Sequence, residues 1–504
     1  MKTLFRASRV HTLSFPESGE WILVDGRHIQ RVGSGAPPDA DRVVDLPGAT
    51  VLPGFIDTHV HLTATGLALG NRDTEETTSA AALLDLARAR ASKGDGPVVL
   101  RGFDETRWDH PRHPGLDELD AVTSRPLVLY RADGHMALAN SAALQAAGLT
   151  EEEGGVERDA SGRPTGRVTQ EALHRMARWA AGSLDDHAIQ ELQLQAAALG
   201  ASRGVTAVHE MSMPSWFGLR DLQVFLGHRE RLPLDAEPVV ATMDIPQIMD
   251  LGLSAIGGDL PVDGSIGART AAVMGPYADA EGSGTCYHHD DELAAFFHGG
   301  HVAGLQVGIH AIGDRAIEQV LSVWERVYHA LDSRERRHFR ARRHRVEHFE
   351  MATTSQVERA AMLGLAVSVQ PTFDRLWGQP GSLYEAGLGW DRASSMNTFR
   401  TMIERGIEVG AGSDSPVTPF DPMLSIAACE SHHSPAQRLS RFEAVRLHTV
   451  GSARVGHQEE KKGALGPGMH ADLVAYDDDP MTAASIEDVR PILTVSLGRE
   501  VFGR

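Results

Sequence analysis

Two histidines separated by one residue, His59 and His61 in the segment GFIDTHVHL, are the first residues whose types and spacing suggest chemistry. Side chains alternate along a β-strand, so both imidazoles would face the same side and could bind one metal ion. With 25 histidines in 504 residues, such a pair is expected about once by chance and is weak evidence alone. The interpretation therefore depends on ligands elsewhere in the chain.

Three further apolar segments end in residues that commonly bind metals. The run 305–309 is followed by His310, the segment HRVEHFE contains His348, and IEVGAGSDSP reaches Asp414 after small residues. Each of these residues taken singly is more often a cap or a surface group. Four apolar segments that all have a potential metal ligand at the same end are hard to explain as caps or surface groups. Histidines combined with a carboxylate are typical of a catalytic site for zinc or a similar divalent ion.

The elements that must position these residues alternate between short apolar runs and helix-like stretches. This alternation predicts parallel strands connected by helices and closed as a (β/α)₈ TIM barrel, whose active site lies at the C-terminal ends of the strands. A doubly wound open sheet is the structural alternative. No GxGxxG motif opens the first strand–helix unit, which argues against a dinucleotide-binding sheet.

The predicted barrel is framed by a second, smaller domain. Residues 53–456 are expected to form the metal-binding barrel, and about 63–180 an insertion over its mouth, because that segment is too long for one connection. Residues 1–52 and 457–504 both contain short β segments with turn signals, and neither has enough apolar surface to fold alone. We expect the two termini together to form one small β domain, either a single sheet or a β-sandwich, and we favour the β-sandwich.

Composition limits the binding partners and the cellular compartment that we expect for this protein. The net charge of −20 repels phosphate backbones and anionic lipid, which argues against nucleic acid and membrane as partners. The only cysteines, Cys286 and Cys429, exclude a disulfide framework and a thiolate zinc cluster. The N-terminus does not resemble a signal peptide, and no apolar run is long enough to span a bilayer. We therefore expect a cytoplasmic enzyme with a small-molecule substrate, and a homodimer as the default assembly.

Several segments together resemble the amidohydrolase superfamily, in the family 3 branch that includes N-substituted formamide deformylase. The resemblance covers nearly the whole chain and is specific for the branch, but it says little about the substrate. It implies a metal-binding barrel with a β-sandwich formed by both termini. The segments that carry it are GFIDTHVHL, DGHMALANSAAL, VDGSIGARTA, QVGIHAIGD, HRVEHFE, VGAGSDSPVTPFDP and the G-x-L-x-P-G-x-x-ADLV stretch near the C-terminus.

The resemblance also implies a role for each ligand candidate. His59 and His61 match the ligands of the first strand, and His310 and His348 match those after the fifth and sixth strands. Asp414 matches the aspartate of the last strand, which contacts the metal and takes a proton from the attacking water. The implied reaction is hydrolysis of a non-peptide C–N bond in an amide, formamide or cyclic amide by water that a zinc ion activates.

One departure from the family pattern concerns the bridging ligand. Many relatives join two metal ions with a carboxylated lysine, and the corresponding position here is Asp259. No lysine lies between Lys93 and Lys461, so a lysine carbamate within the barrel is excluded unless Lys93 reaches in. Either Asp259 or Glu210 supplies a bridging carboxylate, or the site holds a single ion. We favour one zinc ion, with two divalent ions as the alternative.

Other polar and aromatic residues are candidates for substrate binding. Asp133 and His135 follow an apolar run, and His135 could polarise the scissile carbonyl; a loop hydrogen-bond network is the alternative. Arg269 could bind an anionic group bidentately, or it could pair with an aspartate of the barrel. A hydrophobic pocket could be lined by three aromatic residues that could equally pack in the core: Trp108, Phe373 and Trp377.

Two other functions fit part of this pattern. A deaminase of a heterocyclic or amidine-like substrate would use the same ligands, but the glutamate that assists it after the fifth strand has no match in HAIGD. A non-catalytic metal-binding barrel is the other alternative. Five ligand candidates that include a base argue against it, since binding alone needs no base.

Overall fold

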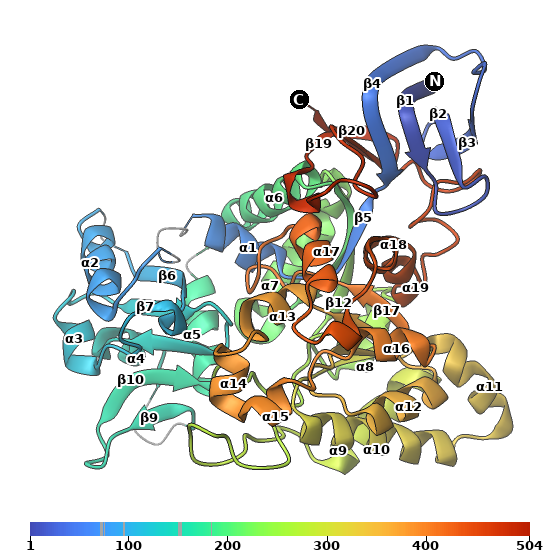
Figure 1. Ribbon diagram of the computed structural model, residues 1–504. Helices are drawn as coiled ribbons and strands as arrows, with labels where there is room; N and C mark the ends of the chain where they lie inside the picture. Colours follow the sequence, from blue (N-terminus) through green and yellow to red (C-terminus); the bar gives the residue numbers. More distant parts are fainter. Residues whose placement is uncertain (71–73, 75, 94–95, 150–153, 183, 504) are drawn as a thin grey trace.

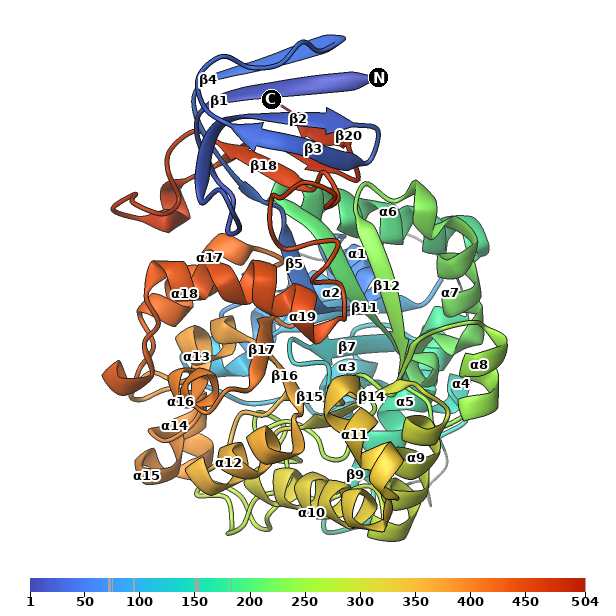
Figure 2. The same cartoon turned by 90° about the vertical axis from the view of Figure 1, so that its right-hand side faces the viewer.

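The computed structural model describes residues 1–70, 74, 76–93, 96–149, 154–182 and 184–503, and its strands form three sheets (Figures 1 and 2). The largest sheet has eight strands, and each neighbouring pair is parallel. In spatial order these strands are β5 (Phe55–Val60), β11 (Val205–Ser212), β12 (Asp235–Val240), β13 (Ala255–Ile256), β14 (Gln306–Ala311), β15 (Arg345–His348), β16 (Ala366–Val369) and β17 (Glu408–Ala411).

The sheet closes on itself where the loop after β17 meets β5. The Asp414 amide donates to the His59 carbonyl at 2.7 Å, and the His61 amide donates to the Ser415 carbonyl at 3.0 Å. The strands are buried on both faces; all eight residues of β11 are buried, as expected when helices surround a parallel barrel. The predicted (β/α)₈ barrel is confirmed.

The helices around the barrel bury one apolar face each. In α10 (Asp314–Ala330) the residues Ile317, Val320, Leu321 and Trp324 are buried at helical spacing. The other helices that follow the barrel strands are α1 (Leu62–Leu69), α6 (Asp186–Ser202), α7 (Pro214–His228), α8 (Ile245–Asp250), α9 (Asp290–Val302), α11 (Ser333–Arg342), α12 (Thr354–Leu363), α13 (Pro371–Trp377), α14 (Leu383–Leu388), α15 (Trp390–Ala393), α16 (Phe399–Glu404), α17 (Pro422–Glu430), α18 (Arg441–Arg446) and α19 (Ser452–Val455). Among the described helices, none is long and apolar enough to cross a membrane.

Both ends of the chain form one separate β domain, as predicted (Figures 1 and 2). Its seven strands belong to a single mixed sheet with a shared core that includes Phe5, Ile22, Leu473 and Val495. The N- and C-terminal parts join where β4 and β18 pair antiparallel. In spatial order the strands are β20 (Arg499–Gly503), β19 (Pro491–Ser496), β18 (Leu473–Tyr476), β4 (Arg42–Pro53), β1 (Lys2–His11), β2 (Ser18–Asp25) and β3 (His28–Gly33).

A third sheet lies within the segment that the sequence suggests as an insertion, on the left in Figure 1. Its turn between β7 and β8 carries Asp133 and His135, which line pockets together with barrel residues. The five strands are β6 (Val98–Phe103), β7 (Leu127–Arg131), β8 (Met136–Ala139), β10 (Pro164–Thr169) and β9 (Val156–Arg158). The helices are α2 (Ala80–Ala91), α3 (Leu116–Asp120), α4 (Ser141–Ala146) and α5 (Gln170–Ala181).

Candidate metal centre

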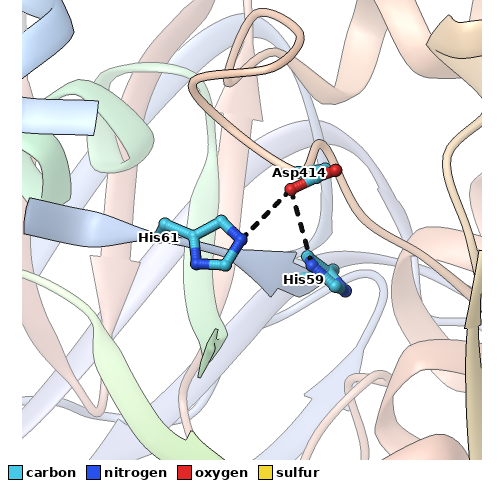
Figure 3. A group of neighbouring side chains, drawn as sticks. All are labelled: His59, His61 and Asp414. Atoms are coloured by element: carbon cyan, nitrogen blue, oxygen red, sulfur yellow. Dashed lines mark ion pairs between the residues drawn. The ribbon is translucent and has the colours of Figure 1, made fainter. Parts of the chain in front are cut away.

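Five residues predicted as ligands meet at the C-terminal ends of the barrel strands. They are all buried: His59, His61, His310, His348 and Asp414. Figure 3 shows the Asp414 carboxylate facing both histidines of the first strand. Its Oδ1 lies 3.3 Å from Nε2 of His61 and 3.5 Å from Nε2 of His59. The barrel therefore brings together residues that lie about 350 positions apart in the sequence, as parallel strands of a closed barrel should.

Asp259, one of the two candidate bridging carboxylates, reaches the middle of this group. Its Oδ1 lies 3.0 Å from Nδ1 of His310, 3.2 Å from Nε2 of His348 and 3.6 Å from Nε2 of His59. Its Oδ2 lies 3.5 Å from Nε2 of His61. One short carboxylate thus touches all four histidines.

Each of the four histidines has one ring nitrogen toward the centre and the other hydrogen-bonded outward. Such outer partners fix the tautomer and leave the inner nitrogen as a lone-pair donor. The outer pairs are His59 Nδ1 with Glu347 Oε2 (2.9 Å), His61 Nδ1 with Met211 O (2.8 Å), His348 Nδ1 with Gln370 Oε1 (2.8 Å) and His310 Nε2 with Gly264 O (3.4 Å).

The spacing of the inner atoms fits a divalent cation. Ligand atoms at 2.0–2.1 Å from a tetrahedral zinc ion are separated from one another by about 3.3 Å. The nitrogen–oxygen distances of Asp414 and Asp259 to His59, His61 and His348 run from 3.2 to 3.6 Å. Nε2 of His59 is also a buried atom without a hydrogen-bond partner among the described residues. A cation bound by these residues would supply the missing partner.

Two overlapping sets of atoms could each hold an ion. One consists of His59, His61 and Asp414, and the other of His59, Asp259 and His348. His59 belongs to both sets through its inner nitrogen, and one imidazole nitrogen binds one ion at a time. The overlap favours a single position over two independent ones.

The backbone at two strand ends adopts a conformation that non-glycine residues rarely take. His348, Phe349 and Asp414 have φ values of 69°, 54° and 54°. Residues held in this left-handed region cost free energy and persist where the surroundings fix them, often at functional sites. The strained turns aim the His348 and Asp414 side chains at the centre.

Asp57, two residues before His59, has a structural role. Its carboxylate accepts hydrogen bonds from the backbone amides of His59 and Ser413 at 3.0 Å, and so links β5 to the loop before Asp414. Burial raises the pKa of Asp57 to about 7, against the opposing effect of these bonds. The side chain holds ligands in place and does not itself join the candidate ligand sets.

The charges of the ligands depend on one another. Burial lowers the pKa of His348, but Asp259 and Asp414 outweigh burial and raise that pKa to about 9. Burial raises the pKa of Asp259, and the surrounding histidines outweigh it and hold that pKa well below its ordinary value. A cation that binds these residues would therefore displace protons from them.

Glu210, the other candidate bridging carboxylate, is hydrogen-bonded to the backbone beside the centre. Its Oε2 accepts a hydrogen bond from the Leu62 amide at 2.8 Å, at the start of α1. Burial raises the pKa of Glu210 to about 8. Neither candidate ligand set in the described chain includes Glu210.

Lys93, the lysine nearest in sequence to the barrel strands, lies exposed just after α2, within the insertion. Of the two candidate bridging carboxylates, Asp259 is the one that contacts the four histidines.

His135 reaches the centre from the insertion. Its ring centroid lies 5.7 Å from that of His310. Asp133 anchors the loop, since it accepts from the His135 amide at 3.1 Å and from Ser265 Oγ at 2.8 Å, and it pairs with Arg131 at 2.8 Å. Burial lowers the pKa of His135 to about 4, so its imidazole is neutral and can donate one hydrogen bond.

Two of the predicted substrate-binding residues make their contacts away from the metal centre. Arg269 pairs with Asp279, with Nε 2.7 Å from Oδ1, and lies over the ring of Tyr277. Trp108 packs in the core of the insertion, stacked on Phe103. Trp377, in contrast, lines a pocket at the centre. The linings of the pockets at the centre, within the described chain, include neither Arg269 nor Trp108.

Some residues at the site were not predicted from the sequence. Glu350 and Tyr384 line the pocket next to His348, and the Tyr384 hydroxyl donates to the Glu350 carboxylate. Glu350 sits two residues after His348 in HRVEHFE, a position that could have suggested it. Trp216 contacts His61 with ring centroids 5.5 Å apart, and nothing in its local sequence indicates this.

A parallel (β/α)₈ barrel with histidines and aspartates gathered at its strand ends is the architecture of metal-dependent hydrolases. The chain belongs to the amidohydrolase family, whose model matches residues 42–502. It is 28% identical to the putative amidohydrolase YtcJ of Bacillus subtilis, over 95% of each chain. It is 26% identical to N-substituted formamide deformylase of Arthrobacter pascens, over 92% of this chain and 91% of that protein.

A solved structure supports the same class. The crystal structure of an uncharacterized metal-dependent hydrolase from Pyrococcus furiosus superposes with a TM-score of 0.74 at 26% identity. The superposition covers 96% of this chain and all of that chain. The fold, with its barrel and its terminal β domain, and the sequence comparisons thus indicate the same family of hydrolases.

Proposed function

We propose that the protein is a zinc-dependent hydrolase that cleaves a non-peptide C–N bond, in an amide, formamide or cyclic amide, in a small molecule. The observation that carries this proposal is the convergence of four histidines with Asp259 and Asp414, among which two sets of three donors could each hold a divalent cation. The relative named N-substituted formamide deformylase supports a C–N bond as the target.

Asp414 is the proposed general base. A divalent cation held by these donors supplies a Lewis acid that lowers the pKa of water and polarises a carbonyl. Asp414 accepts one proton from the attacking water, whose oxygen forms a bond to the acyl carbon. When the C–N bond breaks, Asp414 returns that proton to the leaving nitrogen. Its strained backbone and its position between His59 and His61 hold the carboxylate at the reacting water.

His135 is the proposed partner of the carbonyl oxygen. Its neutral imidazole lies beside His310, and its loop is fixed by Asp133. A fixed hydrogen-bond donor at the oxygen where charge develops stabilises the transition state. Asp133 acts here as a positioning residue, because its carboxylate is already occupied by Arg131 and Ser265.

The proposal is tested by turnover and by metal content. Zinc-loaded protein is assayed against a panel of formamides, N-acyl amines, cyclic imides and lactones. Hydrolysis of C–N substrates in preference to lactones supports it, whereas turnover of lactones alone contradicts it. Elemental analysis of fully active protein should give one equivalent of metal; two equivalents would contradict the single-ion centre.

A further inference from the structure

Two pockets open on the metal centre, and His135 lines both of them. We call the first the amine lobe; it is lined by Glu350, Phe373, Trp377, Tyr384, Asp414 and Val417. We call the second the acyl lobe; it is lined by Leu173, His174, Met213, Trp216, Asp259 and His310. The imidazole of His135 therefore stands between two separate spaces that meet at the ligands.

The direction of proton transfer assigns the two lobes. Asp414 lines the amine lobe, and the described lining of the acyl lobe does not include it. In the proposed reaction Asp414 delivers its proton to the leaving nitrogen. That nitrogen and its substituent must lie on the Asp414 side. The acyl substituent then points past His135 toward Asp259 and His310.

The side chains of the amine lobe suit a planar or apolar amine. Phe373 lies parallel to His348 with centroids 6.1 Å apart, and Trp377 lies 4.8 Å from Phe373. These rings form a continuous aromatic wall that starts at a ligand. Glu350 adds a buried carboxyl group at the same pocket. A carboxyl group favours a departing amine, which gains hydrogen-bond donors as the C–N bond breaks.

The acyl lobe is apolar enough and large enough for more than a hydrogen atom. Leu173, Met213 and Trp216 give it an apolar surface. Its free volume is about 30 Å³, room for about two water-sized groups. The amine lobe has the same free volume but opens more widely to the solvent, so a larger group can extend out of it. A formamide would leave this space unfilled, since its acyl carbon carries only hydrogen. An acetyl or propionyl group would occupy it.

We propose that the preferred substrates are amides with a short acyl chain, such as acetyl or propionyl amides, rather than formamides. This inference rests on the proposed hydrolysis of a C–N bond. The acyl chain fills the acyl lobe against Leu173 and Trp216, and an aromatic amine lies along the aromatic wall and extends out of the more open amine lobe. Burial of each added carbon in the acyl lobe stabilises the transition state over that of the formyl compound.

An acyl-length series tests the proposal with the zinc-loaded wild-type protein. The substrates are the formyl, acetyl, propionyl and pivaloyl para-nitroanilides, and each kcat/KM is divided by the rate of alkaline hydrolysis of the same compound. We expect the corrected value to rise about tenfold from formyl to propionyl and to fall for the branched pivaloyl compound. A corrected value that is highest for formyl overturns the inference but leaves the proposed function intact. No turnover of any member, with C–N substrates also inert in the panel, overturns both.

Two variants locate the effect. His174→Trp adds bulk to the half-buried wall of the acyl lobe, and we expect it to bring the propionyl-to-formyl ratio close to one. Val417→Phe, the matched control in the amine lobe, should lower kcat/KM for every anilide and keep the ratio. If Val417→Phe changes the propionyl-to-formyl ratio and His174→Trp does not, the assignment of the lobes is wrong. Thermal unfolding checks that both variants are folded, and if either is not, the wild-type series decides.

A binding measurement gives a readout that is independent of turnover. Calorimetric titration of the zinc-loaded Asp414→Asn variant with the same anilides should show tighter binding of the propionyl than of the formyl compound, by about tenfold. Equal or reversed affinities would contradict an acyl lobe.

Discussion

The carboxylate of Glu347 accepts a hydrogen bond from Nδ1 of His59 at 2.9 Å, and both side chains are buried within the barrel. Arg345 pairs with the same carboxylate, with Nη2 2.9 Å from Oε2, and compensates its charge. The arrangement fixes the imidazole with Nε2 toward the candidate metal position. A carboxylate behind a ligating histidine also raises the basicity of the ring.

Glu347→Gln is therefore expected to weaken zinc binding by about 10- to 100-fold, because the amide holds the ring less firmly and carries no charge. Competition with a chromophoric chelator measures the affinity. Glu460→Gln, at an exposed position, is the matched control and should leave the affinity as it is. An affinity of the Glu347 variant equal to that of the control would show that this pair does not support the centre.

His135→Ala should lower kcat by about 10²- to 10³-fold, the usual effect of removing one hydrogen-bond donor at a developing oxyanion. The zinc content should stay at the wild-type level, since His135 is not among the ligand candidates. His135→Gln keeps an N–H donor and should recover part of the rate. Loss of zinc together with activity would instead assign His135 to the ligands.

Asp221 provides a test of stability against pH that is separate from the reaction. Its carboxylate accepts from Thr63 Oγ1 at 2.6 Å and from Gln193 Nε2 at 3.2 Å, and burial raises its pKa from 3.8 to about 6. The folded state thus holds this proton more tightly than the unfolded state does. The contribution of Asp221 to the free energy of unfolding must fall as the pH rises through the interval from 3.8 to about 6.

Asp221→Asn keeps both acceptor contacts and removes the buried charge. At pH 8 the variant should be more stable than the wild type, by about 2 to 3 kcal/mol, and near pH 4 the difference should fall to about 0.5 kcal/mol, because the carboxyl group is then protonated in the folded state and partly protonated in the unfolded state. Chemical denaturation at both pH values measures it. Asp250→Asn, at an exposed aspartate, should show no such pH dependence. A gain that is the same at both pH values would contradict a raised pKa of Asp221.

The meeting of histidines and aspartates at the strand ends could be predicted because the sequence pattern itself encodes their positions. An apolar strand that ends in histidine or aspartate places that residue at the mouth of a barrel, whichever helices follow. This is why His310, His348 and Asp414 meet as expected. The exclusion of a lysine bridge also needed only the positions of four lysines.

Side-chain partners between distant segments could not be predicted in this way. The pairing of Arg269 with Asp279, and the packing of Trp108 inside the insertion, depend on how loops fold against their neighbours. The choice of Asp259 over Glu210 depends on a rotation of one side chain toward the Leu62 amide. Periodicity along the chain carries no information about such contacts.

The most direct test compares wild-type protein with Asp414→Asn for both zinc content and hydrolysis of the best para-nitroanilide. The asparagine keeps an oxygen toward His59 and His61 but cannot accept the proton of the attacking water. We predict that the variant retains zinc, while its kcat falls by at least about 10²-fold because general-base catalysis is lost. Turnover equal to that of the wild type, with zinc bound, would contradict the account.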